Sequence, residues 1–415
     1  MHVIIAGGGI AGLTLALGLK QRGIACDVYE SSPEIKALGL GITLLPHAVR
    51  ELSALGLEPR LHEVAIENRF HKFFNRHGQW IYEEARGKFA GYPYPEFGIH
   101  RGRLHMVLLE AVTAQLGADR VHTNHLCTGV EQDERSATLH FKETTTGKPL
   151  PPARGDIVIA CDGVNSVIRK QFYPDDKLAY AGINMWRGVT RHKPIFDGAT
   201  YMRVGSIDTG KMVIYPIVNL DNDNVDGEGN QLINWVAELR RPGAPKNDWH
   251  AQGKLEDFFP VYQDWHFEWL DVAKLIQDAE HILEYPMVDK DPLERWTFGR
   301  VTLMGDAAHP MYPRGANGAA QAIIDARTLA DLLVTSSDPM AALTAYEQAR
   351  IEVTSHIVRT NRQYPPDYIN IKVDELTGGK PFHNIDDVIS QQELKQIAEN
   401  YAKIAGFSKE AVSKT

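Results

Sequence analysis

A glycine-rich turn near the amino terminus constrains this chain more than any other feature. The apolar run 2–6 (HVIIA) is followed by residues 7–12 (GGGIAG), which fit the spacing GxGxxG. Residues 10–22 then carry apolar positions at helical spacing, and a second apolar run at 25–30 ends on Glu30. Strand, turn, helix and strand in this order predict a βαβ unit whose helix amino terminus holds the pyrophosphate of a dinucleotide.

The residues of this motif have separate expected roles. Gly7 permits the tight turn, Gly9 lets a pyrophosphate approach the backbone, and Gly12 allows the helix to pack closely on the sheet. Ala11 lies in the same turn and is expected to contact the cofactor. Glu30 can accept both hydroxyls of an adenosine ribose, and its charge would repel a 2′-phosphate.

The pattern of apolar and polar residues changes twice along the chain. Its length of 415 residues allows two or three domains. Between about 175 and 295, short alternating segments are separated by turn-rich pieces, which is typical of an antiparallel sheet. A short apolar run like that of the first strand returns at 301–304, and long predicted helices follow it. We therefore predict a discontinuous dinucleotide-binding domain (1–175 and 296–356), an antiparallel-sheet domain (176–295) and a C-terminal helical segment (357–415).

Two further motifs follow predicted strands. Residues 305–310 (GDAAHP) come after the run 301–304, and residues 313–319 (PRGANGA) then lead into a helix. Residues 161–166 (CDGVNS), continuing to Arg169, follow the buried run 156–161. With the GxGxxG motif, this order strongly resembles the single-component FAD-dependent aromatic hydroxylases, the flavoprotein monooxygenases related to salicylate and para-hydroxybenzoate hydroxylases. The resemblance covers nearly the whole chain.

The resemblance implies the fold and the cofactor. The expected fold is α/β (α+β), like that of para-hydroxybenzoate hydroxylase: a Rossmann-like FAD-binding domain, an inserted antiparallel-sheet substrate domain and C-terminal helices. Asp306 would bind a ribityl hydroxyl of FAD, backbone N–H groups of 315–319 would meet the flavin pyrimidine edge, Asp162 would lie near FAD, and Arg101 would contact its phosphates or ribose. The expected cofactor contacts are Gly7, Gly9, Ala11, Gly12, Glu30, Gly41, Arg101, Leu126, Asp162, Asp306, Gly315, Asn317, Gly318 and Ala319.

Two positions depart from the family pattern. Asn317 stands where a glycine is common, and His47 stands where an asparagine is common. The segments 38–42 (LGLGI) and 185–188 (MWRG), and the tail segment 401–407 (YAKIAGF), are similar to the phenazine hydroxylase branch, close to salicylate hydroxylases. Membership of this branch does not fix the substrate.

The resemblance also implies the reaction. Because the chain has one GxGxxG and FAD occupies it, NAD(P)H must bind transiently elsewhere as a co-substrate. In the family, reduced flavin reacts with O2 to give a C4a-hydroperoxide, whose distal OH passes to an aromatic or N-heteroaromatic ring. The protein shields that peroxide from water and positions the ring. Pro313, within 310–315, is expected at the flavin face where oxygen reacts.

Six residues are candidates for substrate contact, namely His47, Trp186, Arg187, Tyr201, Tyr215 and Tyr312. His47, Arg187 and Tyr215, together with Pro313, are the catalytic candidates. An imidazole that titrates near neutrality suits proton acceptance from a ring hydroxyl, so His47 is the candidate base. Arg187 could hold an anionic group, and its pairing with an acid in the sheet is equally consistent with the sequence. His309 belongs to the family motif and is expected to be structural.

Three alternatives stay open on sequence grounds. One is an FAD enzyme of the same fold that does not hydroxylate, such as a reductase or a halogenase, although the WxW of the halogenase motif does not occur. The others are an NAD-dependent dehydrogenase that uses the first βαβ unit and a flavin-binding sensor without turnover.

The amino-acid composition limits the expected binding partners and the expected location of the protein. A formal net charge of −9 disfavours nucleic acid, and three cysteines without a CxxC spacing fit reduced thiols in the cytoplasm and no metal site. The uncharged stretch 3–19 is interrupted by glycines, so we expect neither a signal peptide nor an integral membrane segment. The expectation is a cytoplasmic enzyme, monomer or homodimer, that takes a small aromatic substrate and O2.

Overall fold

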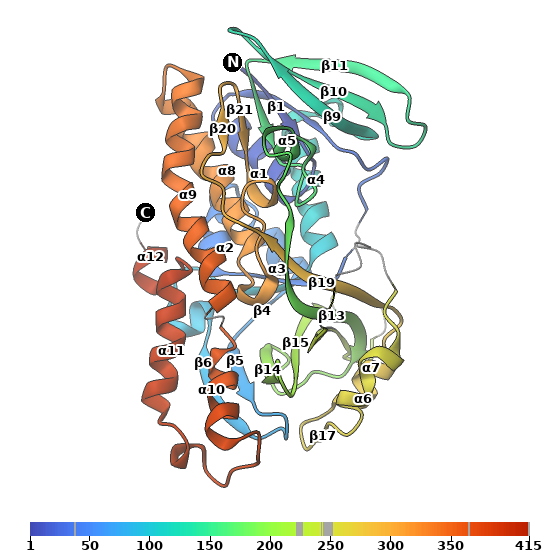
Figure 1. The fold of residues 1–415 in the computed structure, drawn as a ribbon, viewed down its shortest axis with the longest axis vertical. Coiled ribbons are helices and arrows are strands. Elements are labelled where there is room, and N and C mark those ends of the chain that lie inside the picture. Colours follow the sequence, from blue (N-terminus) through green and yellow to red (C-terminus); the bar gives the residue numbers. More distant parts are fainter. Residues whose placement is uncertain (37–38, 221–226, 242, 244–251, 364–365, 414–415) are drawn as a thin grey trace.

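In Figure 1 the computed structural model places two sheet-based parts one above the other, with the long carboxyl-terminal helices along one side. It describes all residues except 37–38, 221–226, 242, 244–251, 364–365 and 414–415. Leu38 of the segment 38–42 therefore lies outside the described residues. In the part of the chain that is described, no helix has both the length and the apolar character needed to cross a bilayer.

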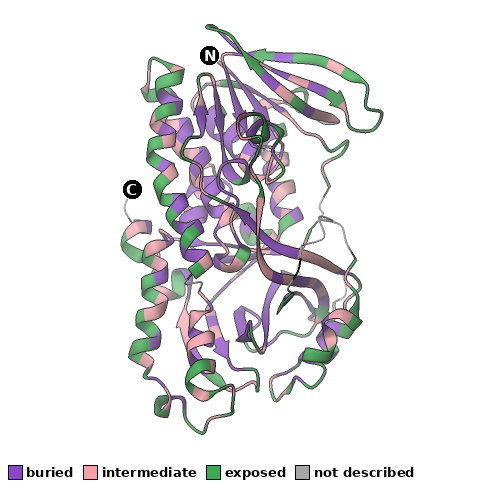
Figure 2. Cartoon of the chain, in the orientation of Figure 1, coloured by how far each residue is buried: buried purple, intermediate pink, exposed green. Residues whose placement is uncertain are grey.

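A six-stranded sheet forms the first part, in the order β20-β21-β12-β1-β2-β8. The strands β2, β1, β12 and β21 run parallel, and this confirms the predicted βαβ unit. Val3, Ile4 and Ile5 are buried because helices cover one face of the sheet and a three-stranded sheet (residues 125–155) packs on the other, and Figure 2 shows a purple interior here. The strands are β1 (His2–Ala6), β2 (Ala25–Tyr29), β8 (Val121–His122), β12 (Ile157–Ala160), β20 (Thr297–Phe298) and β21 (Val301–Leu303).

Four helices pack in and around this part: α1 (Ile10–Gln21), α4 (Arg101–Leu116), α8 (Gly318–Thr335) and α9 (Pro339–Gln363). The last of these extends beyond residue 356, the expected end of the dinucleotide-binding domain, so it reaches from the first sheet toward the second part (Figure 1).

A seven-stranded sheet forms the second part, in the order β19-β13-β16-β15-β14-β5-β6. Residues 70–85, which the sequence placed with the dinucleotide-binding domain, belong to this sheet because β5 pairs in parallel with β14. The division into domains otherwise stays a prediction. The strands are β5 (Phe70–Phe74), β6 (Trp80–Ala85), β13 (Leu178–His192), β14 (Thr200–Ser206), β15 (Gly210–Asn219), β16 (Gln231–Arg240) and β19 (Ile282–Lys290).

The two faces of this second sheet carry different side chains, because successive residues of a strand point to opposite faces. One face packs Trp186 and Trp235 against Phe258 in an apolar core. The other face contains Tyr201 and Tyr215 and is directed toward the first part of the molecule. This second face therefore provides a wall for a site between the two sheets.

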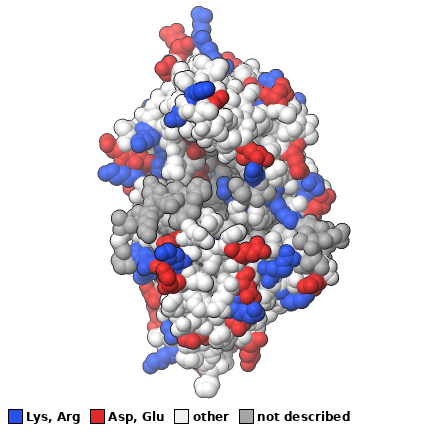
Figure 3. Space-filling model, turned by 90° about the vertical axis from the view of Figure 1, so that its right-hand side faces the viewer, with Lys and Arg blue, Asp and Glu red and all other residues white. Residues whose placement is uncertain are grey.

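Shorter elements complete the fold. The strands of the smaller sheets are β3 (Gly41–Leu44), β4 (Ala65–Glu67), β7 (Phe97–His100), β9 (His125–Gln132), β10 (Ala137–Glu143), β11 (Pro149–Gly155), β17 (His266–Phe267) and β18 (Leu270–Asp271). The remaining α-helices are α2 (Pro46–Ala54), α3 (Glu58–Val64), α5 (Val167–Phe172), α6 (Phe259–Tyr262), α7 (Val272–Gln277), α10 (Tyr368–Thr377), α11 (Gln391–Ile404) and α12 (Lys409–Ser413). On the face seen in Figure 3, basic and acidic side chains are interspersed.

Candidate active site

The glycine turn after β1 is closed toward the protein and open on its outer side. Gly7 has φ +105°, and a Cβ there would lie 2.2 Å from the carbonyl oxygen of Cys161. A Cβ on Gly12 would lie 2.0 Å from the carbonyl oxygen of Gly7, whereas one on Gly9 would meet no heavy atom within 4 Å. The first turn of α1 has no acidic residue, so its free N–H groups can receive a phosphate in the space beside Gly9.

Beside this turn lies a cavity of about 350 Å³. Glu30 and Leu126 line it, as the sequence predicted for cofactor contacts. The carboxylate of Glu30 accepts hydrogen bonds from the backbone N–H groups of Gly8 and Ser32, both at 2.7 Å. Glu30 thus fixes the glycine turn, and its contact with an adenosine ribose stays a prediction.

Asp162 contributes an unsatisfied acceptor to the same cavity. Its Oδ2 accepts the N–H of Val167 at 2.9 Å and so caps α5. Its buried Oδ1 has no hydrogen-bond partner among the described residues, and burial raises the pKa of this carboxyl. A buried acceptor without a partner is costly, so a ligand donor at this point would stabilise the site.

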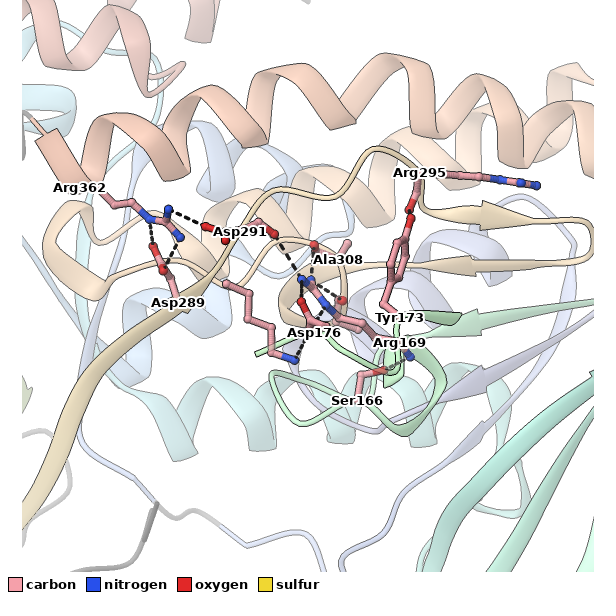
Figure 4. Close-up of polar contacts among 11 residues, drawn as sticks. Ser166, Arg169, Tyr173, Asp176, Asp289, Asp291, Arg295, Ala308 and Arg362 are labelled. Atoms are coloured by element: carbon pink, nitrogen blue, oxygen red, sulfur yellow. Dashed lines mark hydrogen bonds and ion pairs between the residues drawn. The ribbon is translucent and has the colours of Figure 1, made fainter. Parts of the chain in front are cut away.

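Arg169 joins the turn at Asp162 to the turn at Asp306 (Figure 4). Its buried guanidinium donates to the carbonyl oxygens of Ala307 and Ala308 at 3.2 and 2.8 Å and pairs with Asp176 at 2.8 Å. The two motifs that the family resemblance assigns to FAD are therefore locked to each other by one buried cation.

A second ion-pair group seen in Figure 4 anchors α9 to β19. Arg362, at the end of α9, pairs with both carboxylate oxygens of Asp289 at 2.7 and 2.8 Å and with Asp291 at 2.8 Å. A bidentate pair of this kind fixes the angle between the two elements as well as their separation.

The middle of the site is a cavity of about 400 Å³. Arg101 and Asp306 both line it, and Arg101 is the first residue of α4. Asp306 also lines the next cavity; its side chain is exposed there, and partial desolvation by the surrounding cavity walls raises the pKa of its carboxyl. The residues shared by these two cavities are Gly41, Ile42, Met185, Arg187, Asp306, Met311 and Pro313.

This next cavity, of about 210 Å³, lies between the loop 313–319 and the second sheet. We call it the inner cavity. Asn317, Gly318 and Ala319 line one side, and Tyr215 lines the other. The ring of Tyr215 stacks on that of Tyr201 at 4.9 Å, and burial raises the pKa of both phenols.

The wall of the inner cavity also carries charges that the sequence analysis missed. Lys211 pairs with Glu238 at 2.9 Å and with Asp367 at 3.2 Å, and Arg314 pairs with Asp367 at 2.8 Å. Burial alone would raise the pKa of Asp367, but Lys211 and Arg314 hold it well below its ordinary value. Arg203 lines the cavity as well. The signal that could have revealed these charges was a cation and an acid within two buried strands, β15 and β16, where Lys211 and Glu238 are register partners.

His47 lies away from the cavities described above, contrary to its expected place beside the substrate. It is 2% exposed, and its Nε2 lies 3.1 Å from Oδ1 of Asn317. Burial lowers its pKa to about 3, so a proton on this ring is strongly disfavoured and the ring is a weak proton acceptor near pH 7.

Two other candidates for substrate contact also lie elsewhere. Trp186 points to the opposite face of the second sheet and stacks on Phe258 at 5.1 Å, because neighbouring Arg187 takes the cavity-facing position. The Tyr312 hydroxyl is directed to the carbonyl of Ala179 at 3.5 Å.

Ala11, an expected cofactor contact, packs against the turn that carries Asp306. A Cβ built on Gly305 in this turn would lie 3.2 Å from the Cβ of Ala11. Gly315 lines a smaller space behind the loop and has no room for a side chain, since a Cβ would lie 1.9 Å from the Tyr401 hydroxyl.

The glycine cradle, the unsatisfied Asp162 oxygen and the connected cavities fit a flavin dinucleotide. The profile of the FAD binding domain family matches residues 1–177 and 278–361, and the chain belongs to this family. FAD is its cofactor, and the predictions of family, fold, cofactor and FAD-dependent monooxygenase class are confirmed. NAD-dependent dehydrogenation, an alternative on sequence grounds, is thereby set aside.

Individual relatives agree with this assignment. The chain is 40% identical over 365 residues to a phenazine 1,6-dicarboxylic acid hydroxylase of Lysobacter antibioticus, covering 87% of this chain and 89% of the relative. It is 30% identical to a 3-hydroxybenzoate 6-hydroxylase of Polaromonas naphthalenivorans, covering 88% and 87%. Klebsiella pneumoniae HpxO complexed with FAD and uric acid superposes with a TM-score of 0.75 at 22% identity, covering 99% of this chain and 96% of that one, and supports the fold.

Proposed function

We propose that this protein hydroxylates an aromatic carboxylate, with NAD(P)H as reductant and O2 as oxidant, and that a fused N-heteroaromatic ring is its preferred ring system. FAD, when bound, supplies the redox chemistry that activates oxygen. Two relatives support the substrate class, since one is named for a phenazine dicarboxylic acid and the other for a hydroxybenzoate. These names also favour hydroxylation over a reductase or halogenase activity.

The observation that carries the proposal is the state of Arg203. Its side chain lines the inner cavity and the residue is only 4% exposed. Among the described residues, no acid forms an ion pair with it and its Nε has no hydrogen-bond partner, and Asp367 attracts it only at longer range. Its guanidinium lies 5.0 Å from the centre of the Tyr201 ring.

A buried cation without an anion is unfavourable, so the cavity is built to receive a negative charge. Lys211 and Arg314 do not offer the same attraction because their charges are already balanced by Glu238 and Asp367. A substrate carboxylate at Arg203 would complete the missing pair. A planar guanidinium suits that partner because it can donate two parallel hydrogen bonds.

The rest of the wall suits an aromatic ring. Apolar side chains of Met185, Val213 and Val236 line the inner cavity together with the Tyr215 ring. Arg187 donates to the carbonyl of Gly41 at 2.7 Å and thereby holds the strand that joins the inner and middle cavities. These residues bind and orient the ring and exclude water, while the loop that contains Pro313 closes the side toward the flavin.

The test compares a carboxylate with its neutral analogue on the FAD-loaded enzyme. Phenazine-1,6-dicarboxylate and its dicarboxamide are titrated against the parent protein, Arg203→Met and the control Arg240→Met, which removes an exposed arginine of the same sheet. A charge-assisted hydrogen bond is worth about 1.5–3 kcal/mol, so the parent and the control should prefer the carboxylate by about tenfold or more. Arg203→Met should lose that preference. Equal affinity of the parent for acid and amide would refute the proposal.

A further inference from the structure

The two residues that depart from the family pattern, His47 and Asn317, contact each other. Asn317 Nδ2 donates to the carbonyl oxygen of Ala405 at 3.1 Å, so its Oδ1 is the acceptor that lies 3.1 Å from His47 Nε2. His47 must then donate through Nε2–H, which agrees with the absence of a partner on its Nδ1 among the described residues. Asn317 thus connects the loop 313–319 with the C-terminal segment 391–413, which contains α11 and α12.

The contact continues as a buried hydrogen-bonded chain. Gln321 Nε2 also donates to Asn317 Oδ1, at 3.2 Å, and Gln321 Oε1 accepts from Arg350. Arg350 donates to Asp325 at 2.7 Å, and Asp325 accepts the N–H of Gly305 at 3.2 Å. All five residues are buried. One chain of bonds therefore runs from the C-terminal segment, through the flavin loop, to the turn that carries Asp306.

The loop itself is held in a strained conformation. Ala316 has φ +52°, a left-handed conformation that costs a residue with a Cβ on the order of 1–2 kcal/mol. Such a conformation persists where the surroundings fix it. On the side of the C-terminal segment, the Tyr401 hydroxyl lies against Gly315 and donates to Asn361 Oδ1 at 2.9 Å. Tyr401 and Asn317 thus restrain the residues on both sides of Ala316.

We propose that Asn317 is a positioning residue that makes the C-terminal segment part of the flavin site. By holding Ala405, His47 and Gln321 together, it fixes the backbone of 315–319 in the conformation that meets the flavin. The proposal rests on FAD binding and is independent of the substrate class. It explains why a glycine, which could hold none of these groups, does not occupy position 317.

The test compares Asn317→Ala with Asn370→Ala. Asn370 is an equally buried asparagine whose Nδ2 donates to the backbone carbonyl of Phe74 at 2.8 Å, so it ties the C-terminal part of the chain to β5 and lines none of the cavities described above. For each variant, the FAD dissociation constant, the visible absorption spectrum of the bound flavin and the unfolding midpoint are measured.

Asn317→Ala should weaken FAD binding by about tenfold, because three buried groups each lose a hydrogen bond, and should change the flavin spectrum. Asn370→Ala should lower the unfolding midpoint, leave the spectrum unchanged and keep the dissociation constant within about twofold. Parental FAD affinity and spectrum in Asn317→Ala would overturn the proposal. Equal weakening in both variants would do the same, since it would mark the effect as general destabilisation.

Two milder variants cover the case in which Asn317→Ala does not fold. Asn317→Asp keeps the shape and the acceptor but places an oxygen against the Ala405 carbonyl, and Tyr401→Phe removes one hydroxyl. Each should change the flavin spectrum in the folded protein. An unchanged spectrum with parental FAD affinity in both would contradict the positioning role.

Discussion

Replacing His47 with asparagine should make the stability of this protein less sensitive to acid and leave the pH profile of its reaction unchanged. The imidazole is buried and neutral in the folded protein, with a pKa lowered from 6.5 to about 3, chiefly by desolvation. In the unfolded chain the same group takes up a proton below about pH 6.5. The unfolded state therefore binds more protons between these values, and stability falls as the pH drops through 6.5.

The magnitude follows from the separation of the two pKa values. Between pH 7 and pH 5, the unfolded chain gains about 0.7 of a proton at this position and the folded protein gains almost none. The linked loss of stability is about 2 kcal/mol. Asparagine carries no such proton, so this part of the acid sensitivity should disappear in His47→Asn.

The assay is denaturant unfolding of the parent and His47→Asn at pH 7 and pH 5. Asparagine still offers an N–H donor toward Asn317, so the difference between the two pH dependences isolates the titration of the imidazole. Identical acid dependence in both proteins would refute the reasoning. A shifted pH profile of hydroxylation in the folded variant would instead restore the proton role that the sequence suggested for His47.

Three further variants test the cofactor site through flavin retention. Gly7→Ala should lose FAD on gel filtration, because its methyl group would lie 2.2 Å from a backbone oxygen at φ +105°; retained flavin would show that the turn can shift. Asp306→Ala should weaken FAD binding by roughly tenfold to a hundredfold, the equivalent of about 1.5–3 kcal/mol, and parental affinity in a flavin titration would remove Asp306 from the site. Glu30→Ala should release flavin on dilution, since it removes both a ribose acceptor and the bond to Gly8, and full retention would argue against both roles.

The cofactor half of the site was predictable because its motifs are local. A strand that ends in GxGxxG leaves few conformations open to the chain, and Gly7 and Gly12 occupy positions where a Cβ has no room. The turns at Asp162 and Asp306 likewise follow parallel strands directly, and parallel neighbours bring their carboxyl ends together. The family resemblance assigned Asp162 and Asp306 to the cofactor, and the parallel sheet accounts for their place at one edge.

The substrate half depended on pairings between distant segments. Alternation identified β13 as a strand, but it did not decide whether Trp186 or Arg187 faces the cavity, because a shift of one residue exchanges the faces. The pairing of β5 with β14 joins segments about 130 residues apart, which no local pattern specifies. His47 was misplaced for a related reason, since the C-terminal segment that buries it lies far away in the sequence.

The charged residues that line the inner cavity show how the anion-binding residue expected from the sequence can differ from the one proposed from the structure. The sequence offered Arg187 as a possible anion-binding group. This side chain donates to the Gly41 carbonyl, and the more deeply buried Arg203 is the one we propose for the anion, because no acid of the described residues forms an ion pair with it. A charge becomes informative only when its partners are known. In this protein, those partners come from β16 and from the residue before α10.

The most direct test of the central claim is to identify the product formed by the FAD-loaded enzyme from an aromatic carboxylate, NAD(P)H and isotopically labelled O2. The account predicts that the carboxylate accelerates NAD(P)H oxidation and that mass spectrometry finds one labelled oxygen atom in the aromatic product. Oxidation of NAD(P)H that yields only hydrogen peroxide with every aromatic and N-heteroaromatic acid tried, or product oxygen that comes from water, would contradict it.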